Sequence, residues 1–312
     1  MKKSMLLWLC VLIFSCAVIQ PLHANAAPIN TDTECTLTLH YTNNGMGFDN
    51  LDIHIYRVAE AFPDGTFELV IPYSSYPVNI HGITSQKEWK DVASTLSAYI
   101  GADHVQPYRT GKTDESGTVV FDKLETGLYL VGSVTAEDSE GSWLFSEFLM
   151  YLPTPLEDGS FDYDVEAIPK CIGFTPQPEG TKYTVIKLWK DAEYSEQRPV
   201  TITVNILNHG IVQDTVILSA DNNWSYSWTD PDGTGSWAVV ETDVPDHYQV
   251  TITSNETIFM ITNTRQSDQP DPPPTGEIAP IWLYITIMWI LGFLLVIFGI
   301  GVARGRFDEK KQ

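Results

Sequence analysis

Three polar residues, Lys187, Glu241 and Asn263, occur in strand-like runs in which apolar residues alternate with polar ones. Side chains at positions i and i+2 of a strand point to the same face. Each of the three residues therefore shares a face with apolar side chains and is predicted to point into a core. These apolar neighbours are Val185 and Trp189 for the lysine, Val239 for the glutamate and Ile261 for the asparagine.

Burial in a core would make these three side chains able to react with one another. A charged lysine is costly to bury without a partner, and burial favours its neutral amine, which is a nucleophile. A neighbouring carboxyl group can transfer protons, and a carboxamide carbon can be attacked. A simpler alternative is that Lys187 extends its ammonium group to the surface and Glu241 merely pairs with it. Asn263 could likewise be a turn residue at a strand end.

The elements that position these residues are predicted to be almost entirely β-strands. Short alternating runs, such as Thr36–Tyr41 and Asp52–Val58, lie between turn signals such as Asn43–Gly45 and Glu115–Gly117. This spacing is typical of antiparallel sandwiches. Ser85–Ile100 is the exception, because its apolar residues recur at helical spacing. We predict an all-β fold of two tandem immunoglobulin-like sandwiches, the first with one amphipathic helix over an edge, plus a C-terminal transmembrane helix.

The second predicted sandwich resembles a Cna B-type domain across residues 182–265. The resemblance is carried by Val185–Asp191, Arg198–Val204, Leu218–Trp228, Trp237–Glu241, Val244–Tyr248 and Ile261–Thr264. Such domains are immunoglobulin-like modules of Gram-positive adhesins and pilins, and many contain an internal Lys–Asn isopeptide bond whose formation a buried acid assists. The resemblance implies that Lys187 is the nucleophile, Asn263 the electrophile and Glu241 the catalytic acid and base.

The first predicted sandwich resembles, more loosely, the N-terminal domains of shaft and minor pilins. Leu51–Ala59, Gly127–Val131 and Tyr163–Lys170 carry this likeness. Thr36–His40 contains no lysine, so no isopeptide bond is predicted in this block. In pilus backbone subunits, a lysine after proline near the end of this domain accepts the next subunit. The resemblance therefore makes Lys170 a candidate intermolecular lysine, and a surface lysine that opens the linker is the alternative.

Both ends of the chain have the composition of targeting segments. Residues 1–26 combine a basic N-terminal segment, an apolar run and small residues at a cleavage site, as in a signal peptide. A lipoprotein site at Cys16 is the alternative. Residues 278–302 are uncharged and long enough to span a bilayer. Before them, Pro273, Thr275 and Gly276 resemble the sortase motif of Gram-positive surface proteins, cut between threonine and glycine. A Pro-rich linker before a plain membrane anchor is the alternative.

Cys35 and Cys171 remain after loss of the signal peptide. A disulfide between them is permitted outside the cell. If the first and last strands of the block run parallel, however, the two residues lie at opposite ends of a strand pair ~20 Å long, whereas a bridge needs Cα atoms within about 7 Å. The disulfide stays an open prediction.

Charge and motif content exclude several functional classes. The chain has 18 Lys and Arg against 40 Asp and Glu, a formal net charge of −22, and a field of this sign repels nucleic acid. Histidines are scattered without metal-ligand spacing, and no phosphate loop or nucleophile elbow is present. We therefore expect no cofactor, no metal, no nucleic-acid partner and no enzyme activity on an external substrate.

These observations together predict a secreted, cell-wall-anchored structural protein, either a pilin subunit or an adhesin stalk, that passes through a membrane-inserted precursor. Its partners are a sortase and peptidoglycan or other pilin subunits. The alternative is a monomeric adhesin that binds a host matrix protein or glycan through its N-terminal domain. The predicted segments are 1–26 signal peptide, 27–172 pilin-like domain, 173–181 linker, 182–265 Cna B-type domain, 266–277 Pro-rich stalk, 278–302 transmembrane segment and 303–312 basic tail.

Overall fold

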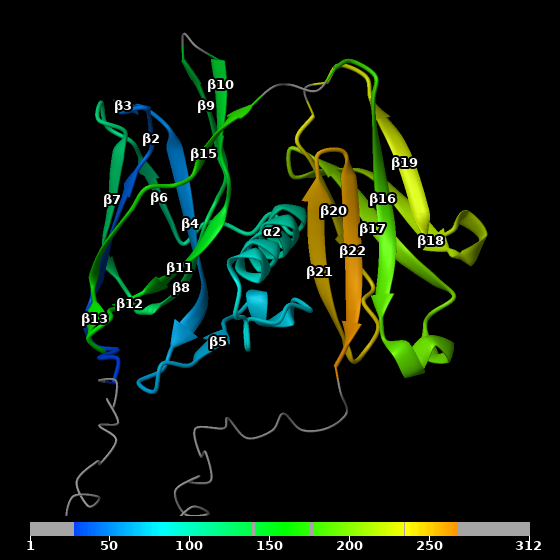
Figure 1. The fold of residues 1–312 in the computed structure, drawn as a ribbon, viewed down its shortest axis with the longest axis horizontal. Helices are drawn as coiled ribbons and strands as arrows, with labels where there is room; N and C mark the ends of the chain where they lie inside the picture. Colours follow the sequence, from blue (N-terminus) through cyan, green and yellow to red (C-terminus); the bar gives the residue numbers. More distant parts are fainter. Residues whose placement is uncertain (1–27, 139–140, 175–177, 234, 267–312) are drawn as a thin grey trace, which may run out of the picture. The chain divides into compact units, whose positions relative to one another are not determined.

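The computed structural model describes residues 28–138, 141–174, 178–233 and 235–266. The predicted signal peptide, the sorting residues Pro273, Thr275 and Gly276, and the predicted membrane span lie outside this part of the chain. Up to Arg265 the described residues belong to one compact unit. Within it, strands dominate, and a single α-helix, α2 (Gln86–Ala102), stands among them (Figure 1). In the described residues no helix is both long and apolar enough to cross a membrane.

The first block, residues 28–174, contains two sheets that face each other, a third sheet of three strands and two two-stranded sheets, β12-β13 and β2-β3. One sheet has the order β14-β1-β7, and its partner has the order β11-β8-β4-β5 with β6 beside β4. The third sheet has the order β15-β10-β9. The strands are β1 Cys35–His40, β2 Thr42–Asn43, β3 Met46–Gly47, β4 Asp52–Ala61, β5 Phe67–Leu69, β6 Arg109–Lys112, β7 Thr118–Leu124, β8 Gly127–Val131, β9 Val134–Asp138, β10 Gly141–Phe145, β11 Phe148–Leu152, β12 Thr154–Pro155, β13 Phe161–Asp162, β14 Asp164–Ala167 and β15 Cys171–Phe174.

The core of the first block forms where the two facing sheets, β14-β1-β7 and β11-β8-β4-β5, turn their apolar side chains toward each other. β1 alternates buried and half-buried residues, so Leu37 and Leu39 point inward. All five residues of β8 are buried, because Tyr129 and Val131 join this core while Leu128 and Leu130 join a second cluster on the opposite face. An antiparallel strand buried on both faces requires a layer on each side.

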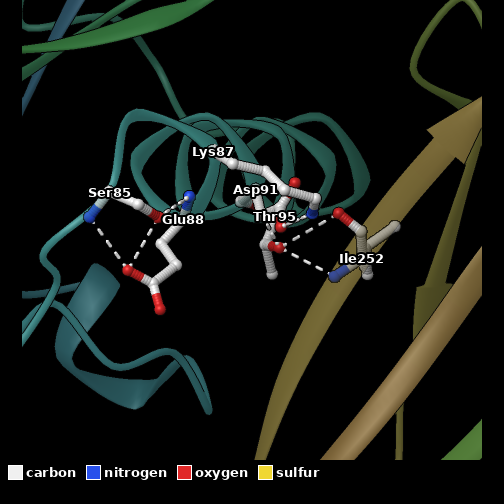
Figure 2. A network of polar contacts seen from close by, with 6 residues as sticks. All are labelled: Ser85, Lys87, Glu88, Asp91, Thr95 and Ile252. Atoms are coloured by element: carbon white, nitrogen blue, oxygen red, sulfur yellow. Dashed lines mark hydrogen bonds and ion pairs between the residues drawn. The ribbon is translucent and has the colours of Figure 1, made fainter.

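The helix α2 supplies that second layer. Ser85 begins it with a capping box, accepting from the Glu88 N–H while the Glu88 carboxylate accepts from the Ser85 N–H (Figure 2). One face of α2 packs on the first block, where Trp89 meets Tyr151 of β11 edge to face. A second face, which includes Thr95 and Tyr99, is buried as well.

The position of α2 corrects the sequence-based prediction of a helix over one sandwich edge. It contacts β8 and β11 of the first block and also β20 and β21 of the second block. The predicted helical stripe was real, but the periodicity of one buried face could not reveal that a second face was covered too. As a result, one apolar cluster runs from the first block through α2 into the second.

The second block, residues 178–266, is a two-sheet sandwich with the orders β19-β16-β22-β21 and β18-β17-β20. Its first and last strands, β16 and β22, pair in parallel, with Lys187 opposite Ile261 and Trp189 opposite Asn263. Inward residues of both sheets, such as Val185, Val204 and Val239, are fully buried. The strands are β16 Thr181–Lys190, β17 Thr201–Asn208, β18 Ile211–Ser219, β19 Ser225–Asp230, β20 Trp237–Glu241, β21 Tyr248–Asn255 and β22 Ile258–Arg265.

The turn at Gly117 shows how a sequence signal becomes a structural requirement. This glycine has a φ of +78°, and a Cβ at this position would lie 2.3 Å from the Tyr41 carbonyl oxygen. Only glycine fits both the left-handed backbone and the close approach. The tight Asp114–Gly117 turn then leads directly into β7.

Candidate functional site

Lys187 points into the core of the second block, as its parity predicts. Its side chain is fully buried, in a strand whose residues alternate between inside and outside. Its Nζ donates a hydrogen bond of 2.8 Å to Glu241 Oε2 and lies 4.4 Å from the centre of the Trp189 ring. The alternative in which Lys187 extends to the surface is therefore wrong.

Glu241 reaches the same place from the opposite sheet. It is the last residue of β20, where it pairs with Val204 of β17, and its side chain is fully buried. While Oε2 contacts Lys187, Oε1 accepts a hydrogen bond of 2.9 Å from Nδ2 of Asn263. A single carboxylate thus contacts both the amine and the carboxamide.

Asn263 completes the group from β22, the strand beside β16. It is fully buried, so it is not a turn residue. Its Oδ1 has no hydrogen-bond partner among the described residues. An unsatisfied buried carbonyl oxygen costs free energy, and buried groups left in this state often belong to functional sites. The carboxamide is therefore held on its nitrogen side and open on its oxygen side.

Burial changes the acid–base behaviour of Lys187. Removal from water is the largest influence and lowers the pKa of its ammonium from 10.5 to about 8; Glu241 and Asp191 partly oppose this shift by favouring the charged form. The neutral, nucleophilic amine is therefore populated near pH 8, far below the range of an exposed lysine.

A second polar cluster lies at the end of β16, and sequence reasoning did not identify it as part of the site. Asp191 is buried and accepts hydrogen bonds from Arg198 Nε at 2.7 Å and from Tyr248 Oη at 2.9 Å. Arg198 Nη2 also donates to Asp191 Oδ1. These donors hold the pKa of Asp191 below its usual range, with the Arg198 hydrogen bond the largest cause. The signal was present, since Asp191 continues the i+2 series of Lys187 and Trp189.

The other predicted sites lie apart from this group. Lys170 is exposed, between β14 and β15. Cys35 is buried in β1 and Cys171 begins β15, and both are thiols. β14 is the strand that runs parallel to β1, whereas β15 pairs with β10 in another sheet. Burial, with a smaller contribution from Asp164, raises the pKa of Cys35 to about 11, so this thiol stays protonated.

One known protein family matches the second block. The family described as Cna protein B-type domain matches residues 183–264. The second block is therefore similar to Cna B-type domains over this range. The match includes Lys187, Glu241 and Asn263 and begins and ends within β16 and β22, so the domain contains the complete second sandwich.

Comparison with solved structures finds several surface proteins. A single B repeat of the collagen-binding surface protein of Staphylococcus aureus is 14% identical, with 75% of this chain and 98% of the repeat covered and a TM-score of 0.27. The full-length major pilin SpaD of Corynebacterium diphtheriae is 11% identical, with coverages of 78% and 100% and a TM-score of 0.31. A minor pilin of Streptococcus agalactiae is 12% identical, with coverages of 76% and 99% and a TM-score of 0.23. Among curated proteins, no sequence matches this chain.

Proposed function

We propose that this chain is a cell-wall-anchored structural protein of the bacterial surface, a pilin subunit or adhesin stalk. In this proposal its Cna B-type domain closes an isopeptide bond between Lys187 and Asn263 without help from another protein. The observation that supports the bond most strongly is the Glu241 carboxylate, which contacts the Lys187 amine with one oxygen and the Asn263 amide nitrogen with the other.

The chemistry follows from that shared carboxylate. Glu241 takes a proton from the Lys187 ammonium, and the neutral Nζ attacks Cγ of Asn263. The new Nζ–Cγ bond forms as the Cγ–Nδ2 bond breaks. Glu241 Oε1 faces the departing Nδ2 and delivers the first proton to it, so that nitrogen leaves as ammonia. Nζ loses a second proton as it becomes the amide N–H, and the Glu241 carboxylate accepts this proton, so that Glu241 ends the reaction neutral. Atoms and charge balance without a cofactor, and the domain reacts once rather than turning over.

The strand order gives the bond a mechanical purpose. β16 and β22 are the first and last strands of the domain and lie side by side in parallel. Tension applied at the two ends of the domain pulls these strands past each other and strips their hydrogen bonds. A covalent link from Lys187 to Asn263 would carry that load directly and leave the intervening strands outside the force path.

Mass spectrometry of the purified full chain tests the bond. We expect a proteolytic peptide pair joined through Lys187 and Asn263 and lighter by one ammonia. Glu241→Gln keeps the shape of the side chain but removes its acid–base function, so closure should slow by roughly 10²–10⁴-fold. Glu256→Gln, at an exposed position of the same domain, is the matched control. Linear peptides of full mass in the wild-type chain would reject the bond.

Anchoring is proposed from the ordered sequence features at the C-terminus. Pro273, Thr275 and Gly276 would be recognised by a sortase, which would join the Thr275 carbonyl to peptidoglycan or to another pilin subunit. Thr275→Ala should leave the protein in the membrane fraction, whereas the wild type should be released by enzymes that digest the wall. Equal wall linkage in both would remove the sorting signal from this account.

Polymerisation through the first block distinguishes a pilin from a monomeric adhesin. Lys170 is exposed and lies at the end of the proposed pilin-like domain, 27–172, where its amine is accessible to an acyl donor. A ladder of covalent multimers in boiled wall extracts would support a pilin, whereas a single band would favour the monomeric adhesin.

A further inference from the structure

The Cna B-type domain has one side on which two strand edges are left without a neighbouring strand. β21 is the last strand of one sheet and β20 is the last strand of the other. Outward N–H and C=O groups of such edge strands need partners, or they remain open to water and to other chains. In this structure the first block supplies partners for several of these groups.

A single helix of the first block serves both edges. The Thr95 hydroxyl accepts a hydrogen bond of 2.8 Å from the Ile252 N–H of β21 and donates one of 2.7 Å to the Asp91 carbonyl of its own helix (Figure 2). One turn later, Tyr99 Oη donates a hydrogen bond of 3.0 Å to the Glu241 carbonyl of β20. Thr95 is fully buried and Tyr99 is 7% exposed.

These contacts hold main-chain groups of Glu241 and of the strand beside Asn263. Tyr99 holds the main chain of Glu241, the residue whose carboxylate contacts Lys187 and Asn263. Thr95 holds Ile252, whose strand β21 pairs with β22 and places Val250 opposite Asn263. The N–H of Val250 in turn donates to the Pro77 carbonyl of the first block at 2.7 Å.

Because Glu241 ends its strand, its position depends on few other contacts. Within the sandwich, β20 pairs with β17 alone, and beyond Glu241 this pairing continues through the Thr242 N–H, which donates to the Thr203 carbonyl at 3.1 Å. A hydrogen bond at the strand end therefore limits fraying of the residue that must bridge amine and amide. A displacement of about 1 Å at a reacting group can cost roughly 10²-fold in rate.

We propose that α2 of the first block is a positioning element for isopeptide closure in the second block, with Tyr99 and Thr95 as its positioning residues. This inference rests on the proposed Lys187–Asn263 bond. It makes the cross-link dependent on assembly of both blocks, so that the second block reacts efficiently only after the first has folded against it.

The test is a closure rate measured on the full chain. Chain collected unfolded in denaturant is diluted into detergent buffer at a series of pH values, and samples are acid-quenched, digested and scored for the joined peptide. Tyr99→Phe removes only the hydroxyl and keeps the ring that stacks on Tyr76. Thr95→Val is a second variant of similar shape. Tyr129→Phe is the matched control, because Tyr129 is also buried and donates to a main-chain carbonyl, Glu125, within the first block.

We expect Tyr99→Phe and Thr95→Val to close the bond at least fivefold more slowly than Tyr129→Phe. A shifted pH profile separates positioning from general destabilisation. The groups that favour the charged form of Lys187 are Glu241 on β20 and Asp191 after β16. A less firmly held Glu241 favours it less, so the pH midpoint of closure should move down in Tyr99→Phe and stay in place in Tyr129→Phe.

The outcomes distinguish the two proposals. If the wild-type chain never forms the joined peptide, the isopeptide proposal fails and this inference falls with it. If the wild type closes normally and both α2 variants match the Tyr129→Phe control in rate and midpoint, the bond stands and the positioning role is rejected.

Discussion

Each of the two blocks pairs its first strand in parallel with a strand near its end, but the blocks differ in the residues found at this junction. In the first block β1 pairs in parallel with β14, and Leu37 lies opposite Val165. In the second block β16 pairs in parallel with β22, and Lys187 lies opposite Ile261. In the facing sheet of each block, β8 ends in the buried Val131, which pairs with Ile55 of β4, and β20 ends in the buried Glu241, which pairs with Val204 of β17.

This difference shows that topology alone does not decide the chemistry of a sandwich. Parallel terminal strands have no hairpin between them, so each block needs another means of holding them together. The first block uses apolar packing, with Leu37 and Leu39 fully buried. The second places an amine, an acid and an amide at the same junction, where a covalent bond can replace part of that packing.

Of the variants considered, Leu37→Lys should have the largest effect, a loss of stability in the first block. A lysine at this fully buried position has no carboxylate opposite it, because Val131 stands where Glu241 would be. An unpaired buried charge destabilises a protein by about 5 kcal/mol, so the first block should unfold well below the wild-type temperature. Chemical denaturation measures the change. Leu37→Met, which keeps the volume, should cost less than about 1.5 kcal/mol, and equal stability of the two variants would contradict the comparison.

Lys187→Met should remove the proposed cross-link from the second block. Closing a loop of about 80 residues is worth about 4 kcal/mol in the chain-entropy estimate used for disulfides, so the free energy of unfolding should fall by about that amount. Calorimetry gives the stability, and intact mass should rise by one ammonia after correction for the substitution. Lys182→Met, at an exposed position of the same strand, is the control. An unchanged melting temperature in Lys187→Met would count against a bond at this site.

The rate of isopeptide closure should depend on pH in the second block only, because the first strand of the first block contains no lysine. The pKa of Lys187 is lowered to about 8. Below this pH, the fraction of neutral amine increases about tenfold for each unit by which the pH rises. The closure rate should therefore rise with pH up to about 8 and then level off. Refolding at fixed pH with quenched sampling measures it. A rate that continues to rise to pH 10 would indicate an amine with the pKa of an exposed lysine.

Lys170→Arg should have the smallest effect on stability. Lys170 is exposed, and substitutions at such positions usually change the free energy of unfolding by less than about 0.5 kcal/mol. Arginine keeps the charge but lacks the amine, so covalent multimers should disappear from wall extracts while the melting temperature stays the same. Lys112→Arg, at another exposed lysine of the first block, should retain the ladder. Persistence of the ladder in Lys170→Arg would exclude this lysine as the acceptor.

Local patterns in the sequence were sufficient for the strands and for the direction of the reactive side chains. A strand alternates its faces with a period of two, and this rule depends on neighbouring residues alone. Thus the inward direction of Lys187, Glu241 and Asn263 could be predicted before their partners were known. The turn at Gly117 and the helix that begins after Ser85 were predictable for the same reason, because turn and capping signals lie within a few residues of the elements they control.

Tertiary structure decided which of these local elements meet. Parity says that Glu241 points inward, but pairing with β17 brings it opposite Lys187 and Asn263. Cys171 likewise continues toward β10 rather than beside β1. The second face of α2 was hidden because Thr95 is polar and Tyr99 was counted in the single apolar stripe that predicted the helix. Their partners, Ile252 and Glu241, lie more than a hundred residues away in the chain. Such contacts exist only after both blocks have folded, so no local pattern in the sequence carries them.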